Sequence, residues 1–113
     1  MIEQRQLAGG ECTIEVEQFK TAGGANTASI KSEGWDADGT SFGKYQQDLA
    51  NNGYPTVLQG FPEHFLVSKP SPNDDETPLQ FQYLAQKWVS DSEQCFQGAY
   101  EGESRGIICA FDC

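Results

Sequence analysis

Four cysteines in a chain of only 113 residues constrain the fold more than any other feature: Cys12, Cys95, Cys109 and Cys113. A chain of this length forms one small domain, whose core alone gives modest stability. An even number of cysteines in a small, loop-rich chain indicates disulfides made in an oxidising compartment. Zinc ligands usually come in close pairs, whereas Cys12 stands alone, so a four-thiolate zinc site is disfavoured. The sequence therefore predicts two disulfides and no metal or other cofactor.

The C-terminal segment indicates which cysteines pair. It predicts a hairpin that turns near Gly102 and places Cys95 opposite Cys109 on one face, within bridging distance. Cys109 and Cys113 are too far apart on one extended strand, about 13 Å at about 3.3 Å per residue. Of the three connectivities that four cysteines allow, Cys95–Cys109 with Cys12–Cys113 is therefore preferred.

Alternation of apolar and polar residues predicts a mostly β-structure. The expected strands cover residues 12–17, 27–35, 56–60, 64–68, 79–86, 95–100 and 105–111. In residues 41–52, by contrast, Phe42, Tyr45 and Leu49 recur at helical spacing, which predicts one short helix. We expect a small antiparallel β-sandwich or β-barrel with one short helix, stapled by two disulfides. Residues 11–113 form this single domain, and residues 1–10 form a flexible N-terminal arm left from a pro-segment or from added sequence.

The charge of the chain excludes several classes of partner. Seventeen acidic and seven basic residues give a formal net charge of −10. Phosphate backbones and anionic membrane surfaces both attract clustered Lys and Arg, so neither nucleic acid nor a membrane is an expected partner. No stretch is apolar enough to span a membrane. Residues 1–10 lack the apolar segment of a signal peptide, so secretion requires that the leader is missing from this sequence.

Few residues offer catalytic chemistry. The single histidine, His64, could act with Glu63 and Arg105 in a ribonuclease-like enzyme. Glu63 and His64 are adjacent on an expected strand, however, so their side chains face opposite ways, and the acidic surface opposes RNA. We therefore predict that the chain is not an enzyme.

The acidic clusters and the aromatic residues of the chain could form a calcium site or a ligand groove, but each also suits a structural role. Asp36 with Asp38, and the acidic run 73–76, could hold calcium, but neither has EF-hand spacing and both suit solvated turns. Aromatic residues could line a groove for a ligand such as a carbohydrate, but at strand spacing they are expected in the core. These aromatic residues are Phe81, Tyr83, Trp88 and Phe96.

The two ends of the chain carry a recognisable pattern. Residues 12–19 (CTIEVEQF) open it, and an aromatic strand and a Trp-Val-Ser-Asp-Ser run (88–92) precede a tail that ends in Cys-Ala-Phe-Asp-Cys (109–113). Between them lie Gly-Ala-Tyr-Glu-Gly (98–102) and Ser-Arg-Gly (104–106). This pattern resembles small secreted proteins of filamentous fungi, and among them the hypersensitive-response-inducing elicitors of plant pathogens of the rice-blast type. Residues 21–60 match poorly.

The resemblance implies a secreted elicitor or effector in the plant apoplast. Such a protein is perceived by an unidentified protein at the plant cell surface or plasma membrane. It triggers defence responses or hypersensitive cell death, and contributes to virulence. The four cysteines carry over as structural residues, and no catalytic residue carries over. We expect a monomer, with candidate surface contacts at Arg105, Asp74, Asp75 and Glu76; the alternative role for Arg105 is to cap a hairpin turn.

Overall fold

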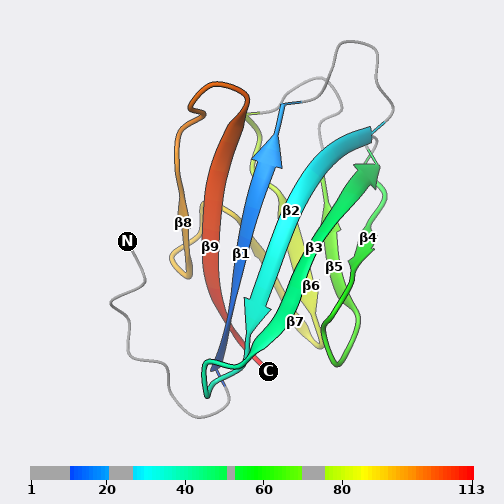
Figure 1. Cartoon of the computed structure of the whole chain (residues 1–113), viewed down its shortest axis with the longest axis vertical. Coiled ribbons are helices and arrows are strands. Elements are labelled where there is room, and N and C mark those ends of the chain that lie inside the picture. The colour runs from blue at the N-terminus through cyan, green and yellow to red at the C-terminus, as the bar shows by residue number, and fades with distance from the viewer. Residues whose placement is uncertain (1–10, 21–26, 51–52, 70–75) are drawn as a thin grey trace.

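Two antiparallel sheets make up the computed structural model, which describes residues 11–20, 27–50, 53–69 and 76–113. The strands are β1 (Glu11–Phe19), β2 (Thr27–Trp35), β3 (Ser41–Ala50), β4 (Thr56–Leu58), β5 (Phe65–Ser68), β6 (Gln80–Tyr83), β7 (Gln86–Val89), β8 (Cys95–Gln97) and β9 (Ser104–Asp112). A five-stranded sheet, β3-β2-β1-β9-β8, faces a four-stranded sheet, β4-β5-β6-β7 (Figure 1). The expected antiparallel β-fold is confirmed, as an open sandwich and not a closed barrel. The predicted arm, residues 1–10, lies outside the described residues.

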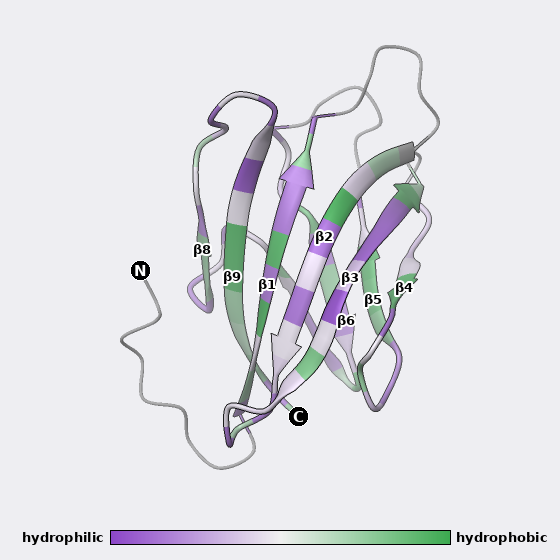
Figure 2. Cartoon of the chain, in the orientation of Figure 1, coloured by the Kyte–Doolittle hydropathy of each residue, from purple (hydrophilic) through white to green (hydrophobic). Residues whose placement is uncertain are grey.

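The core lies between the two sheets and follows the alternation of the strands. On β1, Cys12, Ile14 and Val16 are buried while Glu15 is exposed. Figure 2 shows the same alternation of hydrophobic and hydrophilic residues along β1 and β2, whereas β9 is continuously hydrophobic from Ile107 to Phe111. Because successive strand residues face opposite sides of a sheet, each long strand gives one face to the core and one to solvent.

The predicted helix over residues 41–52 is wrong, because residues 41–50 form β3. This strand pairs with β2 from Ala50, opposite Thr27, to Ser41, opposite Trp35. No helix occurs among the described residues, and therefore none that is long and apolar enough to cross a membrane.

A β-bulge explains the misleading helical spacing. The pairing of β3 with β2 shifts between Glu33 and Trp35, and Gly43 adopts a φ of 105°, which favours glycine. The extra residue brings Phe42 and Tyr45, three apart, to the same side of the sheet. Leu49 follows on that side because it lies an even number of residues after Tyr45. A bulged strand therefore reproduces the apolar spacing of a helix.

A second correction concerns residues 79–86, which were expected to form one strand. They form β6 and the start of β7, joined by a tight turn at Leu84 and Ala85, both of which are exposed. Leu84 has a φ of 54°, which is uncommon for a leucine. The sequence Tyr-Leu-Ala-Gln contains no Gly, Asn or Asp to signal a turn, which is why it reads as continuous strand.

Two glutamine side chains join the sheets at their open sides. Gln47 on β3 donates from Nε2 to the Val57 carbonyl (3.0 Å) and accepts at Oε1 from the Gln59 amide (2.8 Å). Gln86 on β7 donates to the carbonyl of Asp112 (2.6 Å) and accepts from the amide of the same residue (2.9 Å). Each side-chain amide thus donates to one backbone carbonyl and accepts from one backbone amide, as the peptide group of a neighbouring strand would.

We expect Gln47→Glu to lower the free energy of unfolding by about 1–3 kcal/mol, because a carboxylate cannot donate to the Val57 carbonyl. Gln46→Glu is the matched control, since Gln46 is exposed on the same strand and the charge change is identical. Urea unfolding measures both variants. An equal loss of stability in the two would show that net charge, not the amide pairing, is responsible.

Candidate recognition surface

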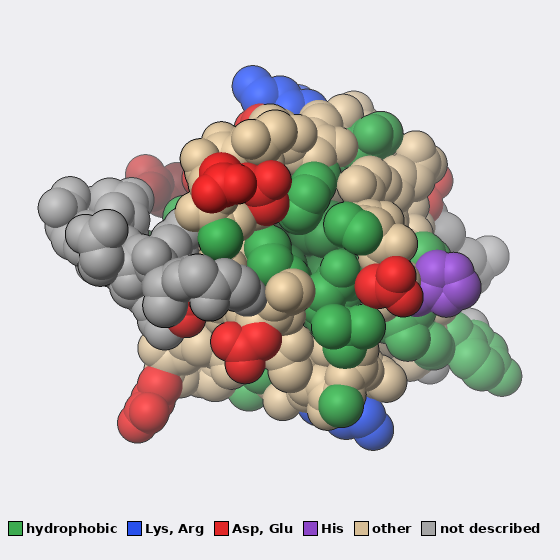
Figure 3. Space-filling view, turned by 90° about the horizontal axis from the view of Figure 1, so that it is seen from below, with side chains coloured by type: hydrophobic (Ala, Val, Ile, Leu, Met, Phe, Trp, Pro, Cys, Tyr) green, Lys and Arg blue, Asp and Glu red, His purple; other side chains and the backbone are tan. Residues whose placement is uncertain are grey.

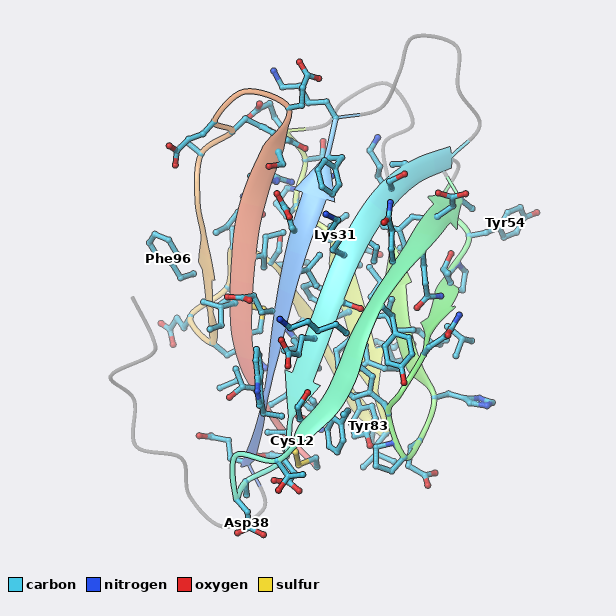
Figure 4. The ribbon with its side chains drawn as sticks, in the orientation of Figure 1. Cys12, Lys31, Asp38, Tyr54, Tyr83 and Phe96 are labelled. Carbon is cyan, nitrogen blue, oxygen red and sulfur yellow. A yellow bond between two sulfur atoms is a disulfide. The ribbon has the colours of Figure 1, made fainter. Side chains whose placement is uncertain are left out.

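The four cysteines form the disulfides Cys12–Cys113 and Cys95–Cys109, the pairs preferred from the sequence. Cys95 lies directly opposite Cys109 in the register of β8 and β9. Cys12 is buried at one end of the sandwich, where it ties β1 to the residue after β9 (Figure 4). Both bridges hold the five-stranded sheet and indicate an oxidising, extracellular environment.

Arg105 is buried rather than presented on the surface, with 4% of its area exposed. Its Nε donates to Oε1 of Gln18 (2.9 Å), and Nη2 and Nη1 donate to the carbonyls of Thr77 (2.9 Å) and Glu76 (3.3 Å). The guanidinium also lies 5.0 Å from the centre of the Tyr100 ring. Arg105 therefore links β9 to the segment before β6, a structural role that neither the predicted surface contact nor a turn cap describes.

The acidic residues proposed as surface contacts are only partly described. Asp74 and Asp75 lie outside the described residues. Glu76 is exposed, and its carbonyl accepts one of the hydrogen bonds of Arg105. Of the candidate contacts that the structure describes, Glu76 alone is accessible.

Replacing Arg105 with methionine is expected to lower the free energy of unfolding by about 2–3 kcal/mol, because Thr77 and Gln18 lose a charged donor. Arg105→Lys should recover little, since an ammonium cannot reach three acceptors in a planar fork. Lys87→Met, on an exposed lysine, is the control and should change stability by less than about 0.5 kcal/mol. Denaturant titration compares them, and similar losses for Arg105→Met and the control would refute the link.

The residues of the ribonuclease alternative are not brought together. His64 is exposed just before β5, at the end of the sandwich seen in Figure 3, where hydrophobic side chains gather with acidic ones around them. Arg105 lies near the start of β9, toward the other end of the sandwich. The ring of Phe111, six residues further along β9, lies 5.1 Å from the ring of Phe65, and Phe65 directly follows His64 in the chain. His64 and Arg105 are therefore separated by about 20 Å, at about 3.3 Å per residue.

The acids at 36 and 38 build a turn. Oδ1 of Asp36 accepts hydrogen bonds from the amides of Asp38 (2.9 Å) and Thr40 (2.9 Å), an arrangement typical of an Asx turn. Within the described ranges, no group of three or more ligating side chains could hold a metal ion.

Three of the four aromatic residues expected in the core, Phe81, Tyr83 and Trp88, are buried there. Phe96 is the exception, with 47% of its area exposed. Cys95 faces inward to its bridge, so the next residue of β8 must face outward. Phe96 accordingly projects from the edge of the five-stranded sheet (Figure 4). The prediction of a core position for Phe96 is wrong.

A trough of about 740 Å³ crosses the outer face of the five-stranded sheet, between Phe96 on β8 and Lys44 on β3. Gly98, directly after β8, and Gly106 on β9 form a glycine strip in this lining, and the Gly98 amide donates a hydrogen bond of 2.8 Å to the Gly106 carbonyl. Beside them, β1 contributes Glu15 and Glu17. The lining thus combines an aromatic wall, a strip without side chains and a pair of carboxylates.

The carboxylates of the trough differ in their partners. Glu33 lies directly opposite Glu15 and accepts a hydrogen bond from Ser41 (2.7 Å), with Lys44 at 3.9 Å. Glu17 accepts from Ser104 (2.8 Å). Within the described residues, the Glu15 carboxylate has no hydrogen bond or ion pair. Like charges placed directly opposite each other are unfavourable. Lys44 beside Glu33, and Lys31 opposite Glu17, offset part of the negative charge, which leaves the Glu15 carboxylate to attract a positive group.

Sequence reasoning did not identify this trough. It used Glu15 and Glu17 only as the polar half of an alternating strand, and Gly98 and Gly106 only as parts of a motif. The signal that could have found it is glycine at outward positions of a hairpin, next to an outward aromatic residue and facing a strand with successive outward acids.

No family model matches this sequence, and no curated protein or solved structure is significantly similar to it. The likeness to fungal elicitors therefore stays a resemblance.

Proposed function

We propose that the chain is a secreted fungal elicitor or effector that a protein at the plant cell surface perceives in the apoplast. On this proposal it triggers defence responses or hypersensitive cell death, and it acts as a monomer by being bound, not by catalysis. One observation carries the proposal: the two bridges, Cys12–Cys113 and Cys95–Cys109, use all four cysteines on which the resemblance depends.

The covalent frame supports recognition as the mode of action. A rigid binding surface loses less conformational freedom when a partner docks, so a larger share of the contact energy appears as affinity. Both disulfides hold the five-stranded sheet, the sheet whose outer face carries the trough. A protein that must stay folded outside the cell and present a fixed surface benefits from both properties.

Leaf infiltration tests the proposal. Purified native protein should give local necrosis or an oxidative burst, whereas reduced and alkylated protein should give none and the Cys95→Ser variant a weaker response, because losing disulfides lowers the fraction of protein that is folded. Lys87→Met serves as a folded control with full response. If correctly folded, oxidised protein gives no response in any of several hosts, the proposed function is wrong.

The enzymatic alternative is tested in the same series. His64→Ala should leave the leaf response unchanged, since His64 takes no part in the proposed recognition. RNA incubated with the wild-type chain should show no cleavage that depends on His64. Loss of both the response and an RNA-cleaving activity in this variant would favour the ribonuclease-like enzyme instead.

A further inference from the structure

Two glycines in the trough have no conformational or packing reason to be glycine. A Cβ built on Gly106 meets no atom within 4 Å, and one on Gly98 meets its nearest atom, the Gly106 carbonyl oxygen, at an ordinary 3.4 Å. Neither has a φ in the left-handed region. Glycine weakens a strand by about 0.5–1 kcal/mol relative to alanine. Glycine inside a strand, as Gly106 is in β9, often marks a place where a ligand or another backbone approaches closely.

The groups beside this strip match a cationic side chain. Glu17 pairs with Gly106 across β1 and β9, and Glu15 pairs with Ile108, the neighbour of Phe96. A lysine or arginine side chain lying on the glycine strip would pack its aliphatic stem against the Phe96 ring. Its charged group would lie within reach of both that ring and the two carboxylates. Four glutamates line the trough, and only two lysines, Lys31 and Lys44, oppose their charge there. The third basic residue of the lining, Arg105, directs its guanidinium to the inner side of the sheet, where it binds Gln18.

The dimensions of the trough suit an extended segment. It spans all five strands of the sheet, a width of about 19 Å at about 4.8 Å per strand. An extended peptide covers this width with about six residues, at about 3.3 Å per residue. Lys31 lies over β1 and β2 at the middle of this face (Figure 4), with its ammonium 5.6 Å from the Phe19 ring, and so does not fill the glycine strip.

We propose that the trough binds an extended, basic segment of a partner protein, seating one Lys or Arg side chain on Gly98 and Gly106 between Phe96 and the Glu15–Glu17 pair. The inference deepens the proposed function, because it rests on the chain acting as a bound protein and names the chemistry of the partner. Charge complementarity selects this occupant. A second copy would bring the same acidic face from a chain of net charge −10. The hydroxyls of a neutral glycan could donate hydrogen bonds to the carboxylates, but a glycan would not neutralise their charge as a basic side chain does.

Direct binding tests the inference. The probe is a fluorescently labelled peptide of alternating lysine and serine, titrated with the disulfide-intact protein at low salt and followed by fluorescence anisotropy. A peptide of alternating glutamate and serine is the negative probe. The wild-type chain should bind only the basic peptide, and binding should weaken as salt is added.

Gly106→Val is the decisive variant, because its side chain fills the strip while the added Cβ meets open space. It should leave the melting temperature unchanged or raised, since valine favours strands, and weaken peptide binding at least about tenfold. Phe96→Ala should also weaken binding, whereas Val57→Ala, at an exposed apolar residue of β4, should not. Unchanged binding by Gly106→Val would refute the site.

Two double variants with the same change in charge distinguish binding at the trough from an effect of the net charge of the chain. Glu15→Gln with Glu17→Gln should weaken binding about tenfold, and Asp38→Asn with Glu63→Gln, exposed acids outside the trough, by no more than about twofold. Equal weakening by both pairs would mean that any acidic surface binds the peptide. Selective binding of a neutral glycan, or dimerisation lost in Gly106→Val, would also overturn the basic occupant.

The leaf assay distinguishes failure of this inference from failure of the proposed function. If Gly106→Val loses peptide binding and leaf response together, the trough is the recognised surface. If it loses peptide binding but keeps the response, the elicitor proposal stands and the trough is not what the plant reads. If the wild-type chain binds the peptide through the trough but elicits nothing, the function fails and the binding site remains.

Discussion

Replacing Phe65 with alanine is expected to lower the free energy of unfolding by about 3–5 kcal/mol. Phe65 has 0% of its area exposed. Its ring meets five others, with centroid distances from 4.6 to 6.0 Å: those of Phe61, Phe81, Tyr83, Trp88 and Phe111. The loss combines lost burial with a cavity that surrounding aromatic rings cannot easily collapse. Since small domains are stable by only about 5–15 kcal/mol, this one change could remove most of the stability.

Phe96→Ala is the matched control, because it removes the same side chain from an exposed position. We expect it to change the free energy of unfolding by less than about 1 kcal/mol. Equilibrium urea unfolding with both disulfides intact measures the two variants. Comparable losses would mean that Phe65 is not the centre of the core. The same control separates stability from binding, since Phe96→Ala should weaken peptide binding while remaining folded.

Strand alternation and cysteine spacing were sufficient to predict the frame of this fold. Alternation from Cys12 onward correctly marks β1, and the bounds expected for β2 match the structure. The C-terminal hairpin placed Cys95 opposite Cys109, which is the observed register. These features depend on local period and on chain geometry, both of which are readable from residue order.

The errors arose where one residue changes the direction of the chain. At Gly43 a bulge converts strand spacing into apparent helical spacing, and a glycine there can be read equally as a helix breaker or as a bulge. At Leu84 the turn is set by pairing between β6 and β7 rather than by turn-forming residues. In both places the contacts of the finished sheets decide the local structure, and a sequence window does not contain them.

The trough was less predictable than the fold, because it depends on the order of strands in space. Glu17 and Gly106 are far apart in sequence and become neighbours only when β9 pairs with β1. The burial of Arg105 was equally unpredictable from the sequence, although here the polar residue is hidden rather than available. A charged residue after a turn suggests exposure, yet its partners Thr77 and Gln18 come from distant segments. Which polar residues are available to a ligand is therefore a property of the packed sheets.

The two disulfides should differ in their contribution, with Cys12–Cys113 the larger. Loop-closure entropy grows with the length of chain enclosed, and the sequence separations are 101 and 14 residues. Removing the long-range bridge by Cys12→Ala with Cys113→Ala should lower the free energy of unfolding by about 4–5 kcal/mol, against about 3 kcal/mol for Cys95→Ala with Cys109→Ala. Chemical denaturation of the two double variants gives the comparison.

The matched pairs of alanines make this comparison informative, because each variant replaces one buried cysteine of β1 or β9 together with a less buried partner. Packing losses at Cys12 and Cys109 should therefore be similar, and the remaining difference reports the enclosed loop. If the short-range bridge proves the more stabilising, native-state packing around β8 outweighs chain entropy. The leaf response should follow the same order, with the Cys12 and Cys113 double variant the less active, because only folded protein presents the outer face of the sheet.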